Sequence, residues 1–296
     1  MKQYIVDAFT EELFGGNPAA VLPCRQMPPS DLMLAIAREN NYSETAFVVR
    51  KGPGRYDLKW FTPGGEVTLC GHATLATSFV LDSIVDKGVG EMHFDTLSGE
   101  LVVRREGSAG AVGADARREL PASHPSDAPS GGSAGYTLDF PVGPYQPVAV
   151  SPLLRHITSG LAQEAYYEEN EDFIAVVPSE ADVLEFEPDY DLLKQLPGRG
   201  LILTAHTFRP GFDFVSRCFY PKLDVPEDPV TGSAHTYLTP LWAGKLGKKT
   251  MTAAQVSRRG GVLKVRLGDA ASGSAGRVFI TGSAVLFMEG EIPFDL

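Results

Sequence analysis

The sequence is poor in cysteine, in positive charge and in long apolar runs, and each shortage excludes a class of protein. Three cysteines in 296 residues are too few, and odd in number, for a disulfide framework, so we expect reduced thiols in a reducing compartment. No apolar run approaches the roughly 18 residues that cross a bilayer. Lys and Arg total 26 against 37 for Asp and Glu, a net charge of −11, which repels phosphate backbones and anionic lipid surfaces. We therefore expect no nucleic-acid partner and no membrane partner.

Targeting and cofactor signatures are also missing. Residues 1–7 have no basic segment followed by an apolar one, so a cytoplasmic location is expected. The six histidines, at positions 72, 93, 124, 156, 206 and 235, never stand at the spacing of a metal site, and there is no Cys-x-x-Cys. Neither a Walker-type phosphate loop nor a Gly-x-Gly-x-x-Gly after a strand is found. The sequence predicts no metal and no cofactor.

What remains is an ordinary globular composition in a chain long enough for about two domains of roughly 150 residues. One segment departs from it: in residues 107–135, 21 of 29 are Gly, Ala, Ser or Pro, which predicts a mobile surface excursion. Residues 136–141 alternate as a strand that could complete the preceding sheet. We therefore place the domains at 1–142 and 143–284, with the tail, about residues 285–296, a candidate for returning to the first domain.

Similar motifs recur in both halves in the same order. WFTP at residues 60–63 leads to LCGHA at 69–73, and CFYP at 218–221 leads to VTGSA at 230–234. Each second motif introduces an expected helix. Two pairs of similar motifs in the same order indicate that the chain consists of duplicated α+β halves. Duplicated halves usually place a site in the cleft between them.

Gly71 and Gly232 mark the starts of these helices, expected over about residues 73–85 and 234–244. The first N–H groups of a helix have no partner within it and carry the positive end of the dipole, so they favour an anion. Either glycine alone is better explained as a tight turn, and Ser233 alone as a helix cap. Their repetition in both halves favours two helix starts that hold a small carboxylate.

Acidic groups next to these motifs are candidates for acid–base chemistry. Glu44 falls between an amphipathic helix and an apolar strand, where partial desolvation would suit it to proton exchange, although an exposed loop carboxylate is the simpler interpretation. Residues 227–235 gather two acids, two hydroxyls and a histidine just before a helix, although a solvated, capped turn also explains them. His72 could donate from its ring or simply pack against the next strand.

Taken together, these motifs resemble the PhzF family of phenazine-biosynthesis proteins. The matching segments are DAFT (7–10), FGGNPAAV (14–21), SETAF (43–47), LCGHAT (69–74), EDPVTGSAH (227–235) and QVSRRGG (255–261). The resemblance covers nearly the whole chain outside residues 107–135. It implies the diaminopimelate-epimerase-like fold, with two pseudo-symmetric α+β domains, each a mixed sheet wrapped around a central helix, and the site in the cleft. It also suggests a homodimer.

The resemblance also implies roles for single residues. In the family's isomerases, which act on trans-2,3-dihydro-3-hydroxyanthranilate without a cofactor, a glutamate matching Glu44 moves a proton between two carbons. His72 and Asp228 would then assist the transfer. The implied substrate-binding residues are Asn17, Ser43, Gly71, Gly232 and Ser233. Related epimerases use a cysteine pair instead, which we expect to be lost here, with Cys70 and Cys218 packed on strands.

The leading hypothesis is thus a cofactor-independent isomerase of a small carboxylate, and two alternatives stay open. One is a Ser/His/Asp hydrolase built from Ser233, Asp228 and either His235 or His72, although the Gly-x-Ser-x-Gly elbow is missing. The other is a non-catalytic, metabolite-binding member of the family that keeps the cleft for structural reasons.

Overall fold

The structure is a computed structural model that describes residues 1–107, 135–168 and 171–293. The expected mobile excursion at 107–135 therefore lies outside the described residues, apart from its two ends. Among the helices that are described, none is long and apolar enough to cross a membrane.

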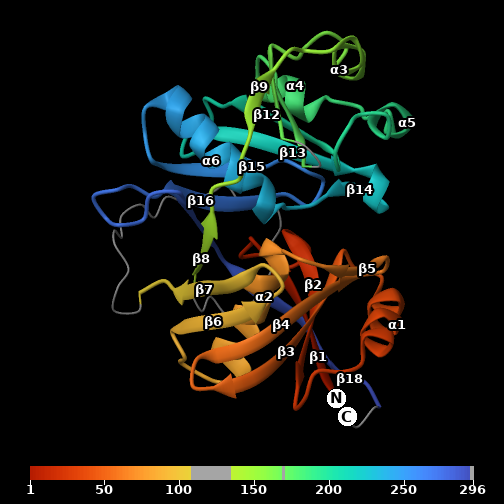
Figure 1. Ribbon diagram of the computed structural model, residues 1–296, viewed down its shortest axis with the longest axis vertical. Helices are drawn as coiled ribbons and strands as arrows, with labels where there is room; N and C mark the ends of the chain where they lie inside the picture. Colours follow the sequence, from red (N-terminus) through yellow and green to blue (C-terminus); the bar gives the residue numbers. More distant parts are fainter. Residues whose placement is uncertain (108–134, 169–170, 294–296) are drawn as a thin grey trace.

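The first half of the chain forms the lower part of Figure 1. Its strands are β1 (Lys2–Ala8), β2 (Asn17–Cys24), β3 (Glu44–Gly52), β4 (Arg55–Thr62), β5 (Gly65–Val67), β6 (Glu91–Thr96), β7 (Gly99–Arg105) and β8 (Tyr136–Pro141). Its helices are α1 (Ser30–Asn40) and α2 (Gly71–Val80), which continues into a π-helical turn over Leu81–Val85.

The second half lies above the first in the same view, apart from its last strand, which lies beside β1 in the lower part. Its strands are β9 (Gln146–Val148), β10 (Glu164–Tyr167), β11 (Phe173–Val176), β12 (Leu201–His206), β13 (Phe214–Tyr220), β14 (Val225–Asp228), β15 (Thr250–Gln255), β16 (Gly261–Leu267), β17 (Arg277–Gly282) and β18 (Ala284–Glu291). Its helices are α3 (Pro152–Ile157), α4 (Glu180–Leu184), α5 (Tyr190–Leu193), a 3₁₀ turn over Pro221–Leu223 and α6 (Gly232–Leu246).

The strand pairing repeats in the two halves. In the first, β1–β2 is antiparallel, β2–β3 parallel, β3–β4 antiparallel, β4–β6 parallel, and β6–β7–β8 antiparallel. In the second, β10–β11, β11–β12, β12–β13, β13–β15 and β15–β16–β17 follow the same alternation. The duplication that the motifs predict is therefore present in the order of the strands.

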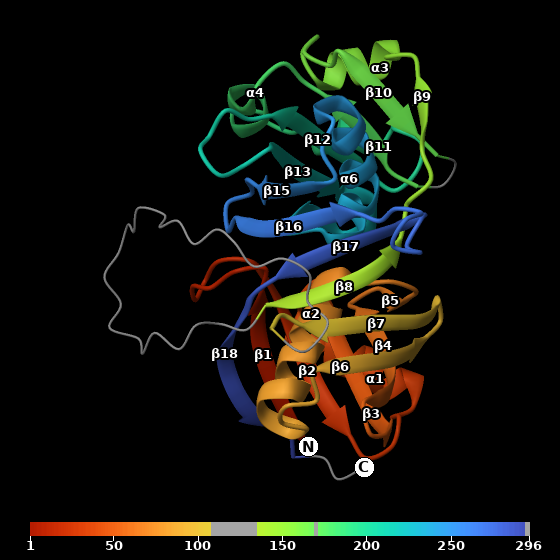
Figure 2. The same cartoon turned by 90° about the vertical axis from the view of Figure 1, so that its left-hand side faces the viewer.

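The two halves are joined by hydrogen bonds rather than by the chain alone. Strand β8 of the first half and β17 of the second pair antiparallel along six positions, as Figure 2 shows at the middle of the molecule. The strand that follows each of these in the chain pairs with a strand of the other half. After β8, strand β9 pairs with β10 of the second half, and after β17, strand β18 pairs with β1 of the first. The two expected sheets are thus one continuous sheet, because each half satisfies the other's open strand edges.

The fold is α+β, and each half of the sheet curls around one helix, α2 below and α6 above (Figures 1 and 2). Nearly every residue of α2 is buried, including its hydroxyl residues. Their hydroxyls donate to carbonyls four residues earlier, as with Thr77 to Ala73 and Ser78 to Thr74, so each of these buried hydroxyls has a hydrogen-bond partner. The largest hydrophobic cluster extends over both halves, and the boundary between residues 142 and 143 stays a prediction.

Deleting residues 108–134 should leave the fold intact. The ends of this segment already meet, because the Glu106 N–H donates to the Gly135 carbonyl at 2.8 Å and Arg105 pairs with Tyr136. A short Gly/Ser linker can therefore close the β7–β8 hairpin at little cost in loop entropy. We expect the melting temperature to fall by less than about 5 °C, roughly 2 kcal/mol for a domain of this size. A larger fall in a thermal melt would show that the segment contributes to the core.

Candidate active site

The starts of α2 and α6 touch each other where the two halves meet. A Cβ atom added to Gly71 would lie 2.9 Å from the Cα of Gly232, and one added to Gly232 would lie 3.0 Å from the Cα of Gly71. Neither helix has a side-chain cap, because Cys70 and Thr231, the N-cap residues, make no capping hydrogen bond. Two uncapped positive helix ends repel each other unless an anion lies between them. The geometry therefore favours an anion at this junction.

Glu44 and His72 face each other at this junction. Glu44 begins β3, and His72 stands in the first turn of α2. Glu44 Oε2 lies 3.1 Å from His72 Nε2, an ion-pair distance at which the angle is poor for a hydrogen bond. The side chain of Glu44 is 17% exposed and that of His72 4%. The Glu44 side chain is thus partly exposed, although its Oε2 is buried, and the imidazole is covered.

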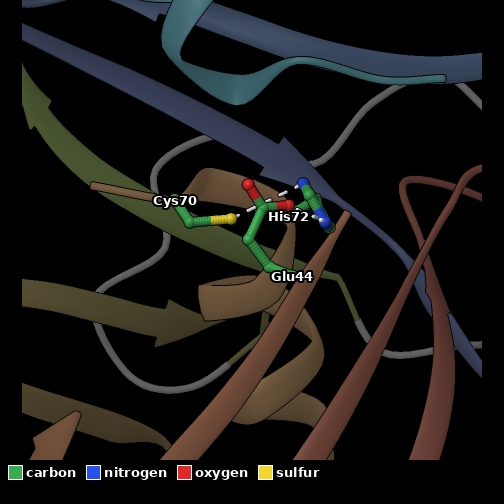
Figure 3. A group of neighbouring side chains, drawn as sticks. All are labelled: Glu44, Cys70 and His72. Atoms are coloured by element: carbon green, nitrogen blue, oxygen red, sulfur yellow. Dashed lines mark hydrogen bonds and ion pairs between the residues drawn. The ribbon is translucent and has the colours of Figure 1, made fainter. Parts of the chain in front are cut away.

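Cys70 completes this cluster, which Figure 3 shows. Its Sγ lies 3.6 Å from His72 Nδ1, and ligand atoms of Glu44, Cys70 and His72 all lie within 4.8 Å of one another. This is a spacing at which a carboxylate, a thiolate and an imidazole could hold one metal ion. The expectation that Cys70 packs on a strand is wrong. It is the N-cap of α2, because the chain must be extended immediately before the helix starts, and this turns its side chain toward the second helical residue.

Burial and charge perturb the groups of the cluster. Burial raises the pKa of the Cys70 thiol to about 11, so it is protonated at neutral pH. Burial alone would lower the pKa of His72, but the neighbouring Cys70 and Glu44 outweigh it, and the pKa lies above its usual range. Since the thiol is neutral, the charge that holds the imidazolium at neutral pH is that of Glu44.

Asn17 joins the first half to the second. From the start of β2, its Nδ2 donates to Asp228 Oδ1 at 2.8 Å and to the Val230 carbonyl at 2.9 Å. The same nitrogen lies 3.1 Å from His72 Nδ1. The two hydrogens of this amide go to the two oxygens, because the Nδ1 of an imidazolium carries a hydrogen of its own and cannot accept. Asn17 therefore binds Asp228 and Val230 of the second half and lies beside the His72 ring of α2.

Asp228 is buried at the end of β14, facing this amide. Burial is the main cause that raises its pKa to about 6. The positive charge of His72 opposes this rise, and the negative charge of Glu44 adds to it. Hydrogen bonds from Thr231 and Asn17 also favour the ionised form. Both protonation states of Asp228 are accessible near neutral pH.

The remaining predicted residues stand next to the cluster without joining it through side chains. Ser43 immediately precedes β3, and Ser233 lies in the first turn of α6, where Thr231 rather than Ser233 is the N-cap. Within the described parts of the chain, neither serine hydroxyl makes a hydrogen bond. Cys218 lies on β13 as expected, paired with Asp228 across the ladder.

The arrangement needed by a Ser/His/Asp hydrolase is not formed. His235 Nδ1 lies 2.8 Å from the Thr231 carbonyl, its ring stacks on Phe214, and burial lowers its pKa to about 4. Among the residues described, no hydrogen bond joins Ser233 to His235 or to His72. A serine nucleophile would need such a contact with its base.

Cys70, Thr231 and Gln255 are the site residues that sequence reasoning missed. Each lay inside a quoted motif, at residues 69–74, 227–235 or 255–261. The available signal was position: Cys70 and Thr231 stand immediately before the two glycines, at equivalent places in the repeat.

The fold and the site together define an α+β protein with duplicated halves and an acid–base cluster where two helix starts meet. The model of the PhzC-PhzF family, described as phenazine biosynthesis-like protein, matches residues 6–290, and the chain belongs to this family. A Pseudomonas aeruginosa protein named as an uncharacterized isomerase is 44% identical over 97% of this chain and 96% of its own length.

Solved structures agree with this assignment. A crystal structure of a PhzF-family phenazine biosynthesis protein from Enterococcus faecalis is 39% identical, with a TM-score of 0.83 over 99% of both chains. A Pseudomonas aeruginosa protein described as a predicted epimerase has a TM-score of 0.67 at 17% identity over 99% of both chains, which shows a shared, epimerase-like fold alone. Family and relatives support an isomerase-type function.

Proposed function

We propose that the protein is a cofactor-independent isomerase of a small carboxylate metabolite, in which Glu44 carries a proton from one carbon of the substrate to another. The observation that carries the proposal is the position of Glu44. It is a partly exposed carboxylate, 3.1 Å from a buried imidazole, beside the two helix starts that abut at Gly71 and Gly232.

The substrate carboxylate binds at the two helix starts. The free N–H groups of the first turns of α2 and α6 supply hydrogen bonds, and both dipoles favour a negative charge there. The half-buried Ser43 and Ser233 flank this position and can add a hydroxyl contact. Holding the carboxylate fixes the distance between the reacting carbons and Glu44, which lowers the entropic part of the barrier.

Glu44 then acts first as a base and afterwards as an acid. It removes a proton from a carbon next to an unsaturated group, and the electron pair left behind spreads into the conjugated system. Protonated Glu44, whose acid hydrogen exchanges with solvent because the side chain is partly exposed, delivers a proton to a second carbon, where that electron pair forms the new C–H bond. One C–H bond breaks and one forms, so no oxidant, reductant or external acid is consumed.

Asp228, His72 and Asn17 support this transfer. The imidazolium of His72 stabilises the Glu44 carboxylate between turnovers. Asp228, whose burial raises its pKa to about 6, can share a proton with a polar group of the substrate. Asn17 holds the Asp228 carboxyl through its amide and lies beside the ring of His72.

An isomerisation assay tests the proposal. A panel of small unsaturated carboxylates, followed by proton NMR without added metal or cofactor and again after EDTA treatment, should yield a positional isomer of at least one member. Binding of several members without any isomer would favour the metabolite-binding alternative. Labelling of Ser233 by a fluorophosphonate would favour the hydrolase.

Replacing the supporting residues should weaken both turnover and binding. We expect Asp228→Asn and His72→Ala each to lower kcat and raise the Kd for the carboxylate, by about 10-fold or more in kcat/KM, because they position the substrate as well as assist the transfer. The matched controls are Asp224→Asn, an exposed residue just before β14, and His93→Ala on the surface of β6. Calorimetry and the isomerisation assay together check this. Losses as large in the controls would mean that the effects are not specific to the site.

A further inference from the structure

Gln255, at the end of β15, uses its whole side chain on the turn that leads from β14 to α6. It is buried, with 1% of its surface exposed. Its Oε1 accepts from the backbone N–H of Thr231 at 2.8 Å. Its Nε2 donates to the backbone carbonyl of Asp228 at 2.7 Å and to Thr231 Oγ1 at 3.1 Å. Both hydrogens of the amide are thereby used.

These contacts give the hydrogen bonds a direction. The Thr231 N–H can only donate, so it must face the oxygen of Gln255, and the amide nitrogen must face the Thr231 hydroxyl. Since this hydroxyl receives a hydrogen from Gln255, its own hydrogen is free to donate. It donates to Asp228 Oδ2, at 2.5 Å. The chain of donors runs from Gln255 through Thr231 to Asp228.

We propose that Gln255 is a positioning residue, which aims the Thr231 hydroxyl at Asp228 and so sets how readily that carboxyl holds a proton. The inference deepens the proposed function, on which it rests for the part that Asp228 plays in proton transfer. Gln255 does not touch the reacting atoms. It acts through Thr231, by holding both ends of the turn and by strengthening the next bond of the chain.

Several groups around Asp228 act on its pKa besides the hydrogen bonds that run from Gln255 through Thr231. From the first half, Asn17 donates to its other oxygen, and the charges of His72 and Glu44 act in opposite directions. From β13, Cys218 lies opposite it and Tyr220 lies near, both with a raised pKa and therefore neutral at pH 7. The hydroxyl of Thr231 lowers the pKa of Asp228, so its loss should raise that pKa.

The direct test is the carboxyl ¹³C NMR titration of Asp228 in the full-length protein, with its signal assigned by its loss in Asp228→Asn. Thr231→Val keeps the side-chain shape without the hydroxyl and should raise the pKa of Asp228 by about one pH unit. Gln255→Met, uncharged and of similar length, should raise it by at least about half a unit. The double variant should match Thr231→Val within about 0.2 units, because Gln255 acts only through Thr231.

Ser257→Ala is the matched control. Ser257 donates to the Pro229 carbonyl of the same turn at 2.7 Å, but it lies outside the chain that ends on the Asp228 carboxyl, so the pKa of Asp228 should stay within about 0.2 units. An unchanged titration in Gln255→Met, full additivity in the double variant, or an equal rise in Ser257→Ala would overturn the proposal. If Gln255→Met does not fold, the titration of Asp228 in Gln255→Glu tests the proposal instead. Its carboxylate competes for the Thr231 hydroxyl hydrogen and should raise the pKa of Asp228, and no rise would contradict the proposal.

The titration needs no substrate, so its result is independent of the proposed function. If the protein is the isomerase, the pH profile of kcat/KM should move in Gln255→Met by the same amount as the titration of Asp228. An altered titration with an unmoved profile would leave the positioning chain intact and remove Asp228 from the reaction.

Discussion

Glu44→Gln should lower turnover by about 10²- to 10⁴-fold, the usual contribution of an acid–base group, which corresponds to roughly 3–5 kcal/mol of transition-state stabilisation. The amide keeps the shape of the side chain but cannot accept a proton. Affinity for the carboxylate should change little, because the anion is held by the helix starts at Gly71 and Gly232 rather than by Glu44. The check is kcat in the isomerisation assay beside Kd from calorimetry.

The matched control for this variant is Glu39→Gln. Glu39 is an exposed carboxylate near the end of α1, five residues earlier in the chain, and its replacement should leave kcat within about twofold. Turnover of Glu44→Gln within tenfold of the wild type would make Glu44 a structural loop carboxylate and would end the proposed mechanism.

Gly71→Ala should have the second large effect, on stability and activity together. The added Cβ would lie 2.9 Å from the Cα of Gly232, closer than real Cβ atoms approach backbone, so α2 and α6 must move apart. Overpacking of this kind costs about 1–3 kcal/mol. A displacement of about 1 Å at the site can cost about 10²-fold in rate. A thermal melt and the isomerisation assay measure the two losses.

Gly244→Ala separates this contact from the general effect of replacing a helical glycine. Gly244 lies exposed in α6, with nothing within 4 Å of an added Cβ. Alanine there should stabilise the protein by about 0.5–1 kcal/mol and leave turnover unchanged. A stable and fully active Gly71→Ala would mean that the two helix starts need not touch.

Local patterns in the sequence predicted the repeated part of the fold well. The strand expected at residues 136–141 is β8, and the helices expected after the two glycines are α2 and α6, each of which begins at the glycine itself. The pairing of β8 with β17 and of β9 with β10 was not predicted, because alternation along a strand shows that it has a neighbour but not which strand that neighbour is.

The sequence pointed to the ionisable groups of the candidate site more fully than to the residues that hold them in place. Glu44, His72 and Asp228 stood out as chemically unusual residues beside turns. Cys70 was misplaced, because a cysteine just before a turn was expected at the end of a strand, whereas it is the N-cap of α2. Gln255 lies more than twenty residues from Asp228 in sequence, and only the folded chain brings them into contact.

The most direct test of Glu44 as a proton carrier is hydrogen exchange between solvent and a carbon of the substrate. A carboxylate that binds the protein is incubated with it in D₂O, and deuterium at carbon is followed by NMR and mass spectrometry. If Glu44 carries the proton, the wild type incorporates deuterium at the carbons that change during isomerisation, and Glu44→Gln slows this by at least about 10²-fold. Exchange that persists in Glu44→Gln, or wild-type isomerisation without any solvent deuterium in repeated turnovers, would contradict it.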